Sequence, residues 1–205
     1  MIRKDKSAEK REDIARIATD VFFAKGYKEA SLRDISVSGK LSKAGIYHYF
    51  PTKSEILSYL MVKSANGLID AITQGSRIAK GEKLDPRETF ELICRKYLGY
   101  LLKNRKSSSI VLRDRHQLTG QQKEKLMEKE RTIFHLVRDK LCEISNIDNS
   151  KNLNLMTFQV ISGMHWMGYW FDPKGPLSVD ESSAQLMNNI LNGVLNSGAR
   201  LNKAR

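Results

Sequence analysis

The sequence predicts an all-α protein in which an N-terminal three-helix head is followed by a larger helical domain, about nine helices in total. Apolar residues recur at intervals of three and four along most of the chain, the spacing of helices with one buried face. From residue 80 onward no segment shows the alternation of β-branched residues that predicts strands. With 205 residues and 40% hydrophobic content, the chain can bury one large core or two modest ones. We expect the head to span residues 1–52 and the second domain residues 53–205.

The first two helices are defined by their ends. A helix is predicted over residues 8–25, where Gly26 ends it, and its buried stripe comprises Ile14, Ile17, Ala18, Val21 and Phe22. Ser31 and Asp34 form an N-terminal capping pair for a second helix that ends near Ser38. We expect Ile35 and Val37 to supply the buried side chains of this helix.

A turn at Gly39 and Lys40 leads into a third helix of about two turns, which Ser42 caps. Ile46 is expected to face the domain. The residues left to face outward are Lys43, Ala44, Gly45, Tyr47 and His48. Two helices joined in this way form a helix-turn-helix, whose second helix contacts base edges in the major groove of DNA.

The outward residues suit contacts with bases. Lys43 can donate to a guanine and Tyr47 can pack on a thymine methyl group, while small residues at 44 and 45 allow the backbone to approach closely. A tyrosine in an isolated helix would more often be half-buried core. Its place beside a capped helix of about two turns favours the contact with DNA.

The second domain begins with a long helix, which Thr52 and Glu55 open as a capping box. Asp85, Pro86 and Glu88 start the next helix with a cap, an N1 proline and a box acid. Its inward residues are Phe90, Ile93, Cys94, Tyr97, Leu98, Leu101 and Leu102. Further helices are predicted over residues 107–117, 121–145, 152–171 and 180–200, with a break at 146–151.

The last two predicted helices differ in their apolar surfaces. Residues 152–171 are apolar on more than one face, whereas 180–200 carry a narrower stripe at Met187, Ile190, Leu191, Val194 and Leu195. A helix that is apolar on several faces must be covered on several sides. We therefore expect these two helices to pair with their copies in a homodimer, as a four-helix interface.

The segments DIARIATDVFFAKGY, SLRDIS and LSKAGIYHYFPTKSEIL resemble the N-terminal domain of the tetracycline repressor (TetR) family of bacterial transcription regulators. The resemblance covers about residues 10 to 60. It implies a dimer on double-stranded operator DNA, with recognition helices spaced by about one DNA turn, roughly 34 to 36 Å or somewhat more. It also implies phosphate contacts from Ser31, Arg33, Tyr49 and Lys53, beside base contacts around Ser42 to His48.

The chain departs from the family pattern at two places in the helix-turn-helix. Lys40 stands where the family usually has glycine, with Gly39 one position earlier, so the turn is expected to adopt a slightly different backbone. Ala44 and Gly45 stand where the family usually has Gly-Thr or a similar pair, which removes a hydroxyl. The operator sequence therefore does not transfer from the family.

The C-terminal half resembles the subgroup that controls fatty-acid and acyl-coenzyme A catabolism, in the segments RDRHQLTGQQKEKLMEKERTIF and MHWMGYWFDPKGPLSVDE. Between Arg95 and Lys140 there are 13 Lys and Arg against 5 Asp and Glu, which suits a ligand bearing phosphates. The candidate effector-binding residues are Phe90, Leu98, Leu101, Arg131, Met164, Trp166 and Met167. The tryptophans fit dimer or core packing equally well. A neutral or cationic hydrophobic compound, as in a multidrug-type regulator, is the alternative effector.

Composition favours an anionic partner, because the formal net charge is +12. The N-terminal run MIRKDKSAEKR contains five basic residues. As a flexible arm it would lie along phosphates or enter the minor groove, and as an ordinary terminus it would be solvated. Cys94 and Cys142 lack metal-ligand spacing and are expected to be reduced thiols in a cytoplasmic protein.

Other function classes lack support in the sequence. No nucleophile, base and orienting residue can be assembled, so we expect no enzyme, no catalytic residues and no cofactor. The four histidines form no metal-ligand set, and no apolar run is long enough to span a bilayer, so neither a metal nor a membrane partner is expected. A DNA-binding protein whose effector pocket is filled by side chains stays open as a third possibility.

Overall fold

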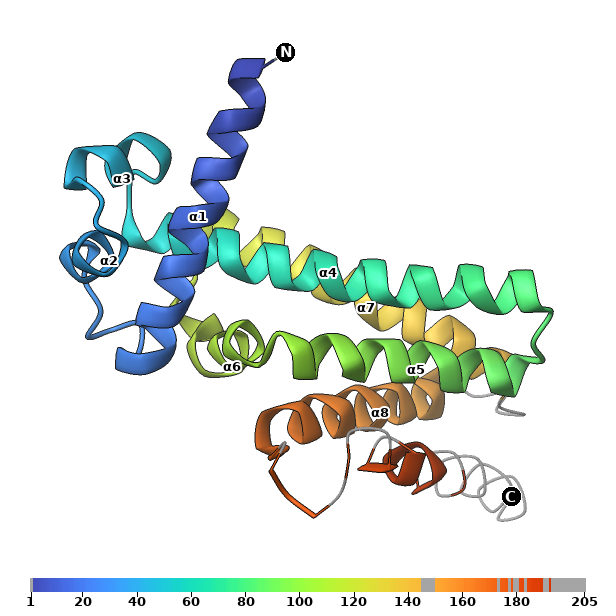
Figure 1. Ribbon diagram of the computed structural model, residues 1–205. Coiled ribbons are helices and arrows are strands. Elements are labelled where there is room, and N and C mark those ends of the chain that lie inside the picture. The colour runs from blue at the N-terminus through green and yellow to red at the C-terminus, as the bar shows by residue number, and fades with distance from the viewer. Residues whose placement is uncertain are drawn as a thin grey trace. The chain divides into compact units, whose positions relative to one another are not determined.

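The computed structural model describes residues 2–144, 150–172, 174–176, 178, 181–182, 184–189 and 192. All secondary-structure elements in the described residues are helices (Figure 1). In chain order they are α1 (Ile2–Lys25), α2 (Leu32–Gly39), α3 (Lys43–Tyr49), α4 (Lys53–Glu82), α5 (Pro86–Lys103), α6 (Arg105–Asp114), the 3₁₀ helix η1 (Arg115–Gln117), α7 (Gly120–Ile144) and α8 (Ser150–Trp170). The all-α class predicted from the sequence is therefore confirmed. Helix limits lie within a few residues of those expected, except at the N-terminus.

The chain forms two compact units. The first contains residues 1–65 and 106–129, and the second contains residues 66–105 and 130–205. The head that we expected over residues 1–52 thus lies in a unit that also includes most of α6, η1 and the first part of α7. Helices α4 and α7 each contribute residues to both units.

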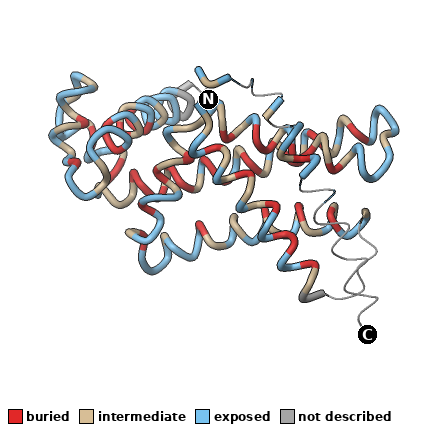
Figure 2. The backbone as a smooth tube through the Cα atoms, turned by 90° about the horizontal axis from the view of Figure 1, so that it is seen from below, coloured by how far each residue is buried: buried red, intermediate tan, exposed pale blue. Residues whose placement is uncertain are grey.

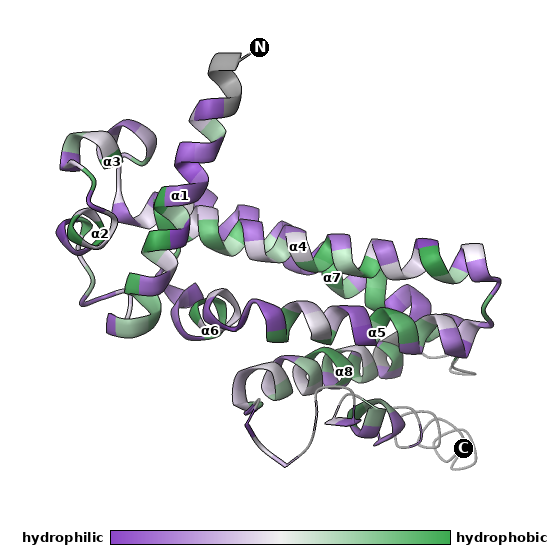
Figure 3. Ribbon diagram, in the orientation of Figure 1, coloured by the Kyte–Doolittle hydropathy of each residue, from purple (hydrophilic) through white to green (hydrophobic). Residues whose placement is uncertain are grey.

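Helix α1 starts much earlier than predicted, at Ile2 instead of residue 8. Of the two alternatives for this segment, the structure does not show a flexible arm, because residues 2–11 belong to the helix, and residues 6–11 are exposed on it. Figure 3 colours most of this exposed part of α1 hydrophilic, apart from the residues drawn in grey. The buried stripe begins at Ile14 and Ala15, which are 1% exposed.

Helix α2 buries one side chain of the two expected. Ile35 is 0% exposed, whereas Val37 is 71% exposed, so the prediction for Val37 is wrong. The two positions differ by about 200° around a helix and cannot share a buried face. Only one of them can pack against α1.

The second unit is built around α5 and α8, which pack against each other. The capping box at Asp85 and Glu88 and the proline at the start of α5 are present as predicted. Phe90, Ile93, Tyr97 and Leu101 form one buried face of α5, and Figure 2 shows buried positions recurring along one side of the helices. A Cβ on Gly168 of α8 would meet Leu101 Cβ at 3.0 Å, so a glycine there permits the close approach.

The last predicted helix is described only in part. Ser178 and Glu181 form reciprocal hydrogen bonds at its start, where Ser178 N donates to Glu181 Oε2 at 2.8 Å and Glu181 N donates to Ser178 Oγ at 3.1 Å. Residues 181–182, 184–189 and 192 are helical, and Met187 is buried. The predicted stripe residues Ile190, Leu191, Val194 and Leu195, and the predicted break at 146–151 apart from its last two residues, lie outside the described residues.

Truncation of Ile35 should destabilise the head far more than truncation of Val37. We expect Ile35→Ala to lower the free energy of unfolding by about 2–5 kcal/mol, since it leaves a cavity against α1. Val37→Ala should change it by less than about 0.5 kcal/mol. Urea unfolding of both full-length variants, followed by circular dichroism, measures the difference. Equal losses would show that Val37 also packs in the head.

Candidate nucleic-acid interface

Helix α3 presents the outward face that the sequence predicts. Its N-cap is Ser42, whose hydroxyl accepts a hydrogen bond from Gly45 N at 3.0 Å. Ile46 is 0% exposed and anchors the helix to the head, while Tyr47 is 52% exposed. Lys43, Ala44 and His48 are also exposed, and Gly45 is half-buried. A short helix held by one buried isoleucine therefore projects a mixed basic and aromatic surface.

The turn between α2 and α3 keeps a left-handed residue although Lys40 replaces the usual glycine. Lys40 lies in the left-handed region at φ 50° and ends α2, with its N–H donating to Ser36 and Val37 carbonyl oxygens. A Cβ on Gly39 would lie 2.7 Å from Ile17 Cδ1. A side chain at position 39 would therefore force the Ile17 side chain to move, and Lys40 adopts the backbone conformation that favours glycine.

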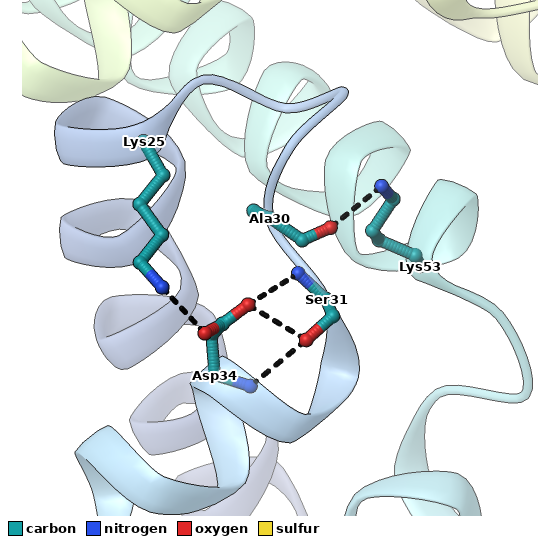
Figure 4. Close-up of polar contacts among 5 residues, drawn as sticks. All are labelled: Lys25, Ala30, Ser31, Asp34 and Lys53. Carbon is teal, nitrogen blue, oxygen red and sulfur yellow. Dashed lines mark hydrogen bonds and ion pairs between the residues drawn. The ribbon is translucent and has the colours of Figure 1, made fainter.

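The N-terminus of α2 is held by a compact set of polar contacts (Figure 4). The Ser31 hydroxyl donates to Asp34 Oδ2 at 2.6 Å and accepts from Asp34 N at 3.1 Å, and Ser31 N donates to the same carboxylate at 2.8 Å. Lys25 Nζ lies 2.5 Å from Asp34 Oδ1. The Lys25 ammonium and the Ser31 donors hold the pKa of Asp34 well below its ordinary value. Both donors of Ser31 are therefore engaged within the head.

Lys53, the first residue of α4, is also engaged within the head. Its Nζ donates to the carbonyl oxygens of Ala30 at 2.7 Å, Tyr27 at 2.8 Å and Lys28 at 3.2 Å, and Figure 4 shows the contact with Ala30. The same ammonium lies 4.4 Å from the centre of the Tyr27 ring. These contacts hold the turn that joins α1 to α2, a role that differs from the phosphate contact implied by family resemblance.

Of the four implied phosphate contacts, Ser31 and Arg33 are exposed, and Tyr49 and Lys53 are half-buried. Arg33 is exposed on α2, and Tyr49 is half-buried at the end of α3 with its ring 4.9 Å from that of His48. Sequence reasoning missed Arg11, whose guanidinium carbon lies 4.7 Å from the centre of the Phe50 ring and 5.0 Å from that of Tyr59. Its helical spacing gave no signal of this contact, which links α1 to the start of α4.

Helices α6 and α7 are joined to α1 and α4 within the first unit. Arg113 Nη2 donates to the Phe22 carbonyl oxygen at 2.6 Å, while Arg113 Nε donates to the buried Asp114 carboxylate at 2.9 Å. The Ser54 hydroxyl donates to Gln122 Oε1 at 2.5 Å. A pocket of about 340 Å³, open to solvent, is lined by residues 24–29, 113–114 and 116–117.

The candidate effector residues do not all share one environment. Phe90, Leu98, Leu101 and Met164 are buried in the second unit, at 0–1% exposed. Trp166 is 64% exposed, Met167 is half-buried and Arg131 is exposed on α7. Trp166 and Arg131 are therefore exposed, unlike the four buried side chains predicted to share a site with them.

The sequence did not single out Tyr97 and His165 as a pair. Tyr97 Oη lies 2.8 Å from His165 Nε2, and the two residues stand 68 positions apart. Within the described residues no group of three or more metal-binding side chains occurs. None of the helices so described is long and apolar enough to cross a membrane.

The capped recognition helix, packed on two further helices and followed by a helical domain, defines a helix-turn-helix DNA-binding protein. Comparison with known families then identifies it. Residues 14–60 match the model of bacterial regulatory proteins of the tetR family, and residues 83–194, over half of the chain, match a tetracyclin repressor-like C-terminal domain. The chain belongs to the TetR family of transcription regulators.

Individual relatives are distant but extend over most of the chain. The HTH-type transcriptional repressor KstR2 of Rhodococcus jostii (strain RHA1) is 20% identical over 189 residues, covering 90% of this chain and 91% of the relative. A TetR-family regulator from Bordetella parapertussis 12822 has a TM-score of 0.80 at 24% identity, covering 91% of this chain and 96% of its own. AibR, solved in complex with isovaleryl coenzyme A and operator DNA, has a TM-score of 0.72 at 17% identity, with 91% and 98% covered.

Removal of the Lys53 ammonium should loosen the turn between α1 and α2. We expect Lys53→Met to lower the free energy of unfolding by about 1–3 kcal/mol, because three carbonyl oxygens lose a charged donor. The Ala30 amide, which donates to the Gly26 carbonyl oxygen at 3.1 Å, should exchange its hydrogen faster. Hydrogen exchange and urea unfolding measure both effects, with Lys43→Met as the control. Unchanged exchange at Ala30 would rule out the supporting role.

Proposed function

We propose that this protein binds operator DNA as a homodimer and represses transcription until a small effector releases it. The observation that supports DNA binding most directly is the exposed face of α3 beside a buried Ile46. Base contacts come from Lys43, Tyr47 and His48. The helix start at Ser42 and the small residues Ala44 and Gly45 let the backbone approach the groove wall.

Phosphate contacts come from Arg33 and Tyr49 in this proposal. Arg33 is exposed and supplies the charge, while Tyr49 supplies a hydroxyl beside the His48 ring. Ser31 and Lys53 act differently, because their donors are taken up by Asp34 and by the carbonyl oxygens of the α1–α2 turn. They position the residues that contact DNA.

The homodimer forms through the last two helices. The exposed apolar residues of α8 are Leu155, Phe158, Trp166, Tyr169 and Trp170, and all but Trp170 follow one stripe at intervals of three, eight and three residues. Trp166 stacks on Tyr169 with ring centres 6.1 Å apart. An aromatic face of this kind marks a protein–protein contact, and the same stripe on a second copy matches it in a two-fold interface.

The effector is an acyl-coenzyme A or a fatty acid. One support is the excess of basic residues in the sequence between Arg95 and Lys140, which contains 13 Lys and Arg but 5 Asp and Glu. The other is the apolar core formed by α5 and α8. AibR, a structural neighbour, was solved with isovaleryl coenzyme A. A cationic ligand is less suited, since Asp114 is the single acid among the described buried residues and it is paired with Arg113.

Effector and DNA binding are coupled through helices shared by the two units. Helix α4 begins at Lys53 against the α1–α2 turn and continues to Glu82, among residues of the second unit. A ligand that shifts α4 therefore acts on the contacts that position α2 and α3. Such coupling typically changes each affinity by an amount worth about 1–3 kcal/mol.

Substitutions in the head should separate affinity from sequence preference. Arg33→Ala should weaken binding to all DNA sequences and reduce the slope of log affinity against log salt by about one, because one phosphate contact is lost. Lys43→Ala should change which operators are selected. Salt titrations and selection from a random DNA library measure the two effects. An unchanged selected sequence for Lys43→Ala would contradict its role as a base contact.

Charge on the aromatic face of α8 should dissociate the homodimer. We expect wild-type protein to sediment as a dimer at micromolar concentration and Trp166→Lys/Trp170→Lys to sediment as a monomer with weakened operator binding. Leu112→Lys, at another exposed apolar position on α6, is the control and should remain dimeric. A stable wild-type monomer would refute the proposed interface.

A further inference from the structure

One buried polar atom of the second unit, on the half-buried residue His165, has no partner. Among the described residues, two buried side-chain polar atoms lack a hydrogen bond, Ser108 Oγ in the first unit and His165 Nδ1 in the second. A buried donor or acceptor without a partner costs free energy, so native proteins seldom retain one without a use. His165 lies on α8 next to the buried Met164, and the ring faces α5.

The hydrogen bond at the other ring nitrogen, Nε2, determines whether Nδ1 is a hydrogen-bond donor or an acceptor. Tyr97 Oη lies 2.8 Å from His165 Nε2, and the rings meet edge to face with centres 5.7 Å apart. A phenol is a stronger acid than a neutral imidazole N–H, and an imidazole nitrogen is a better acceptor than a phenol oxygen. The favoured arrangement therefore has Tyr97 O–H donating to Nε2, which leaves the hydrogen on Nδ1.

The surroundings keep both groups neutral. Burial lowers the pKa of His165 to about 4, and burial raises the pKa of Tyr97 above its ordinary value. Phe90, Leu98 and Leu101 lie on the same helix as Tyr97 and are buried. A neutral, buried N–H beside apolar side chains suits a neutral acceptor on an apolar ligand, whereas an ionised carboxylate would lose its hydration without gaining a cation.

We propose that His165 Nδ1–H is the donor to the thioester carbonyl oxygen of an acyl-coenzyme A effector, and that Tyr97 is the positioning residue that holds its tautomer. This inference rests on the proposed function, and it favours the thioester over the free fatty acid. Tyr97 belongs to α5 and His165 to α8, so a ligand bound at Nδ1 acts on the contact between these helices.

A matched pair of probes isolates the carbonyl. Octanoyl-coenzyme A and its thioether S-octyl-coenzyme A differ only in that oxygen, and calorimetry on the full-length protein measures both dissociation constants. We expect the thioether to bind about tenfold more weakly to wild-type protein, the loss of one hydrogen bond. Octanoate should bind more weakly than the thioester by a similar factor or more.

Two variants of His165 test which nitrogen is used. The side-chain amide of His165→Asn can place a donor near Nδ1, whereas that of His165→Gln reaches toward Nε2 and can still pair with Tyr97. We expect His165→Asn to retain a preference for the thioester and His165→Gln to lose it. The ¹⁵N chemical shift of Nδ1 in wild-type protein should change with octanoyl-coenzyme A and stay unchanged with the thioether.

The outcomes separate this inference from the proposed function. Equal binding of thioester and thioether, with no effect of His165→Gln, would overturn the carbonyl contact and leave an acyl-coenzyme A effector in place. If neither compound binds, both the carbonyl contact and the effector class are overturned. Operator binding by the same protein then shows that the DNA-binding part of the proposal stands by itself.

Discussion

The ammonium group of Lys53 determines the geometry of the DNA-binding head, because it satisfies three carbonyl oxygens of the turn between α1 and α2. This turn starts at Gly26, whose φ of 83° ends α1, and its carbonyl groups have left the helical ladder. A charged donor from the start of α4 replaces the missing partners. The direction of α2, and through the next turn that of α3, thus depends on where α4 begins.

The polar residues of the head divide into those that support it and those that face outward. Ser31, Asp34 and Lys25 close the start of α2 among themselves, and Ser42 closes the start of α3. These residues make their hydrogen bonds within the head and hold the starts of α2 and α3 in place before DNA is bound. Lys43 and Tyr47, by contrast, are exposed on the outer face of α3. A recognition surface of this kind loses little conformational freedom on binding, apart from its long side chains.

The second unit combines an apolar core with two features that a simple packing unit would not need. Its α5–α8 core contains the Tyr97–His165 hydrogen bond, and α8 exposes Trp166 and Trp170 on its surface. Both features lie on α8, one on the buried side and one on the exposed side. A ligand bound at His165, as proposed, would act on the helix that exposes the two tryptophans, and the proposed homodimer contact would then respond to the effector.

The sequence alone determined the class, the helices and the starts of the capped helices, because capping depends on residues three positions apart and burial stripes on helical spacing. Ser31 with Asp34, Asp85 with Glu88 and the inward Ile46 are of this kind. Tertiary structure decided the partners of Lys53, 23 to 26 residues away, and of His165, 68 residues away. It also decided that Val37 and Trp166 are exposed. Such contacts depend on how whole helices pack, and no local spacing encodes that.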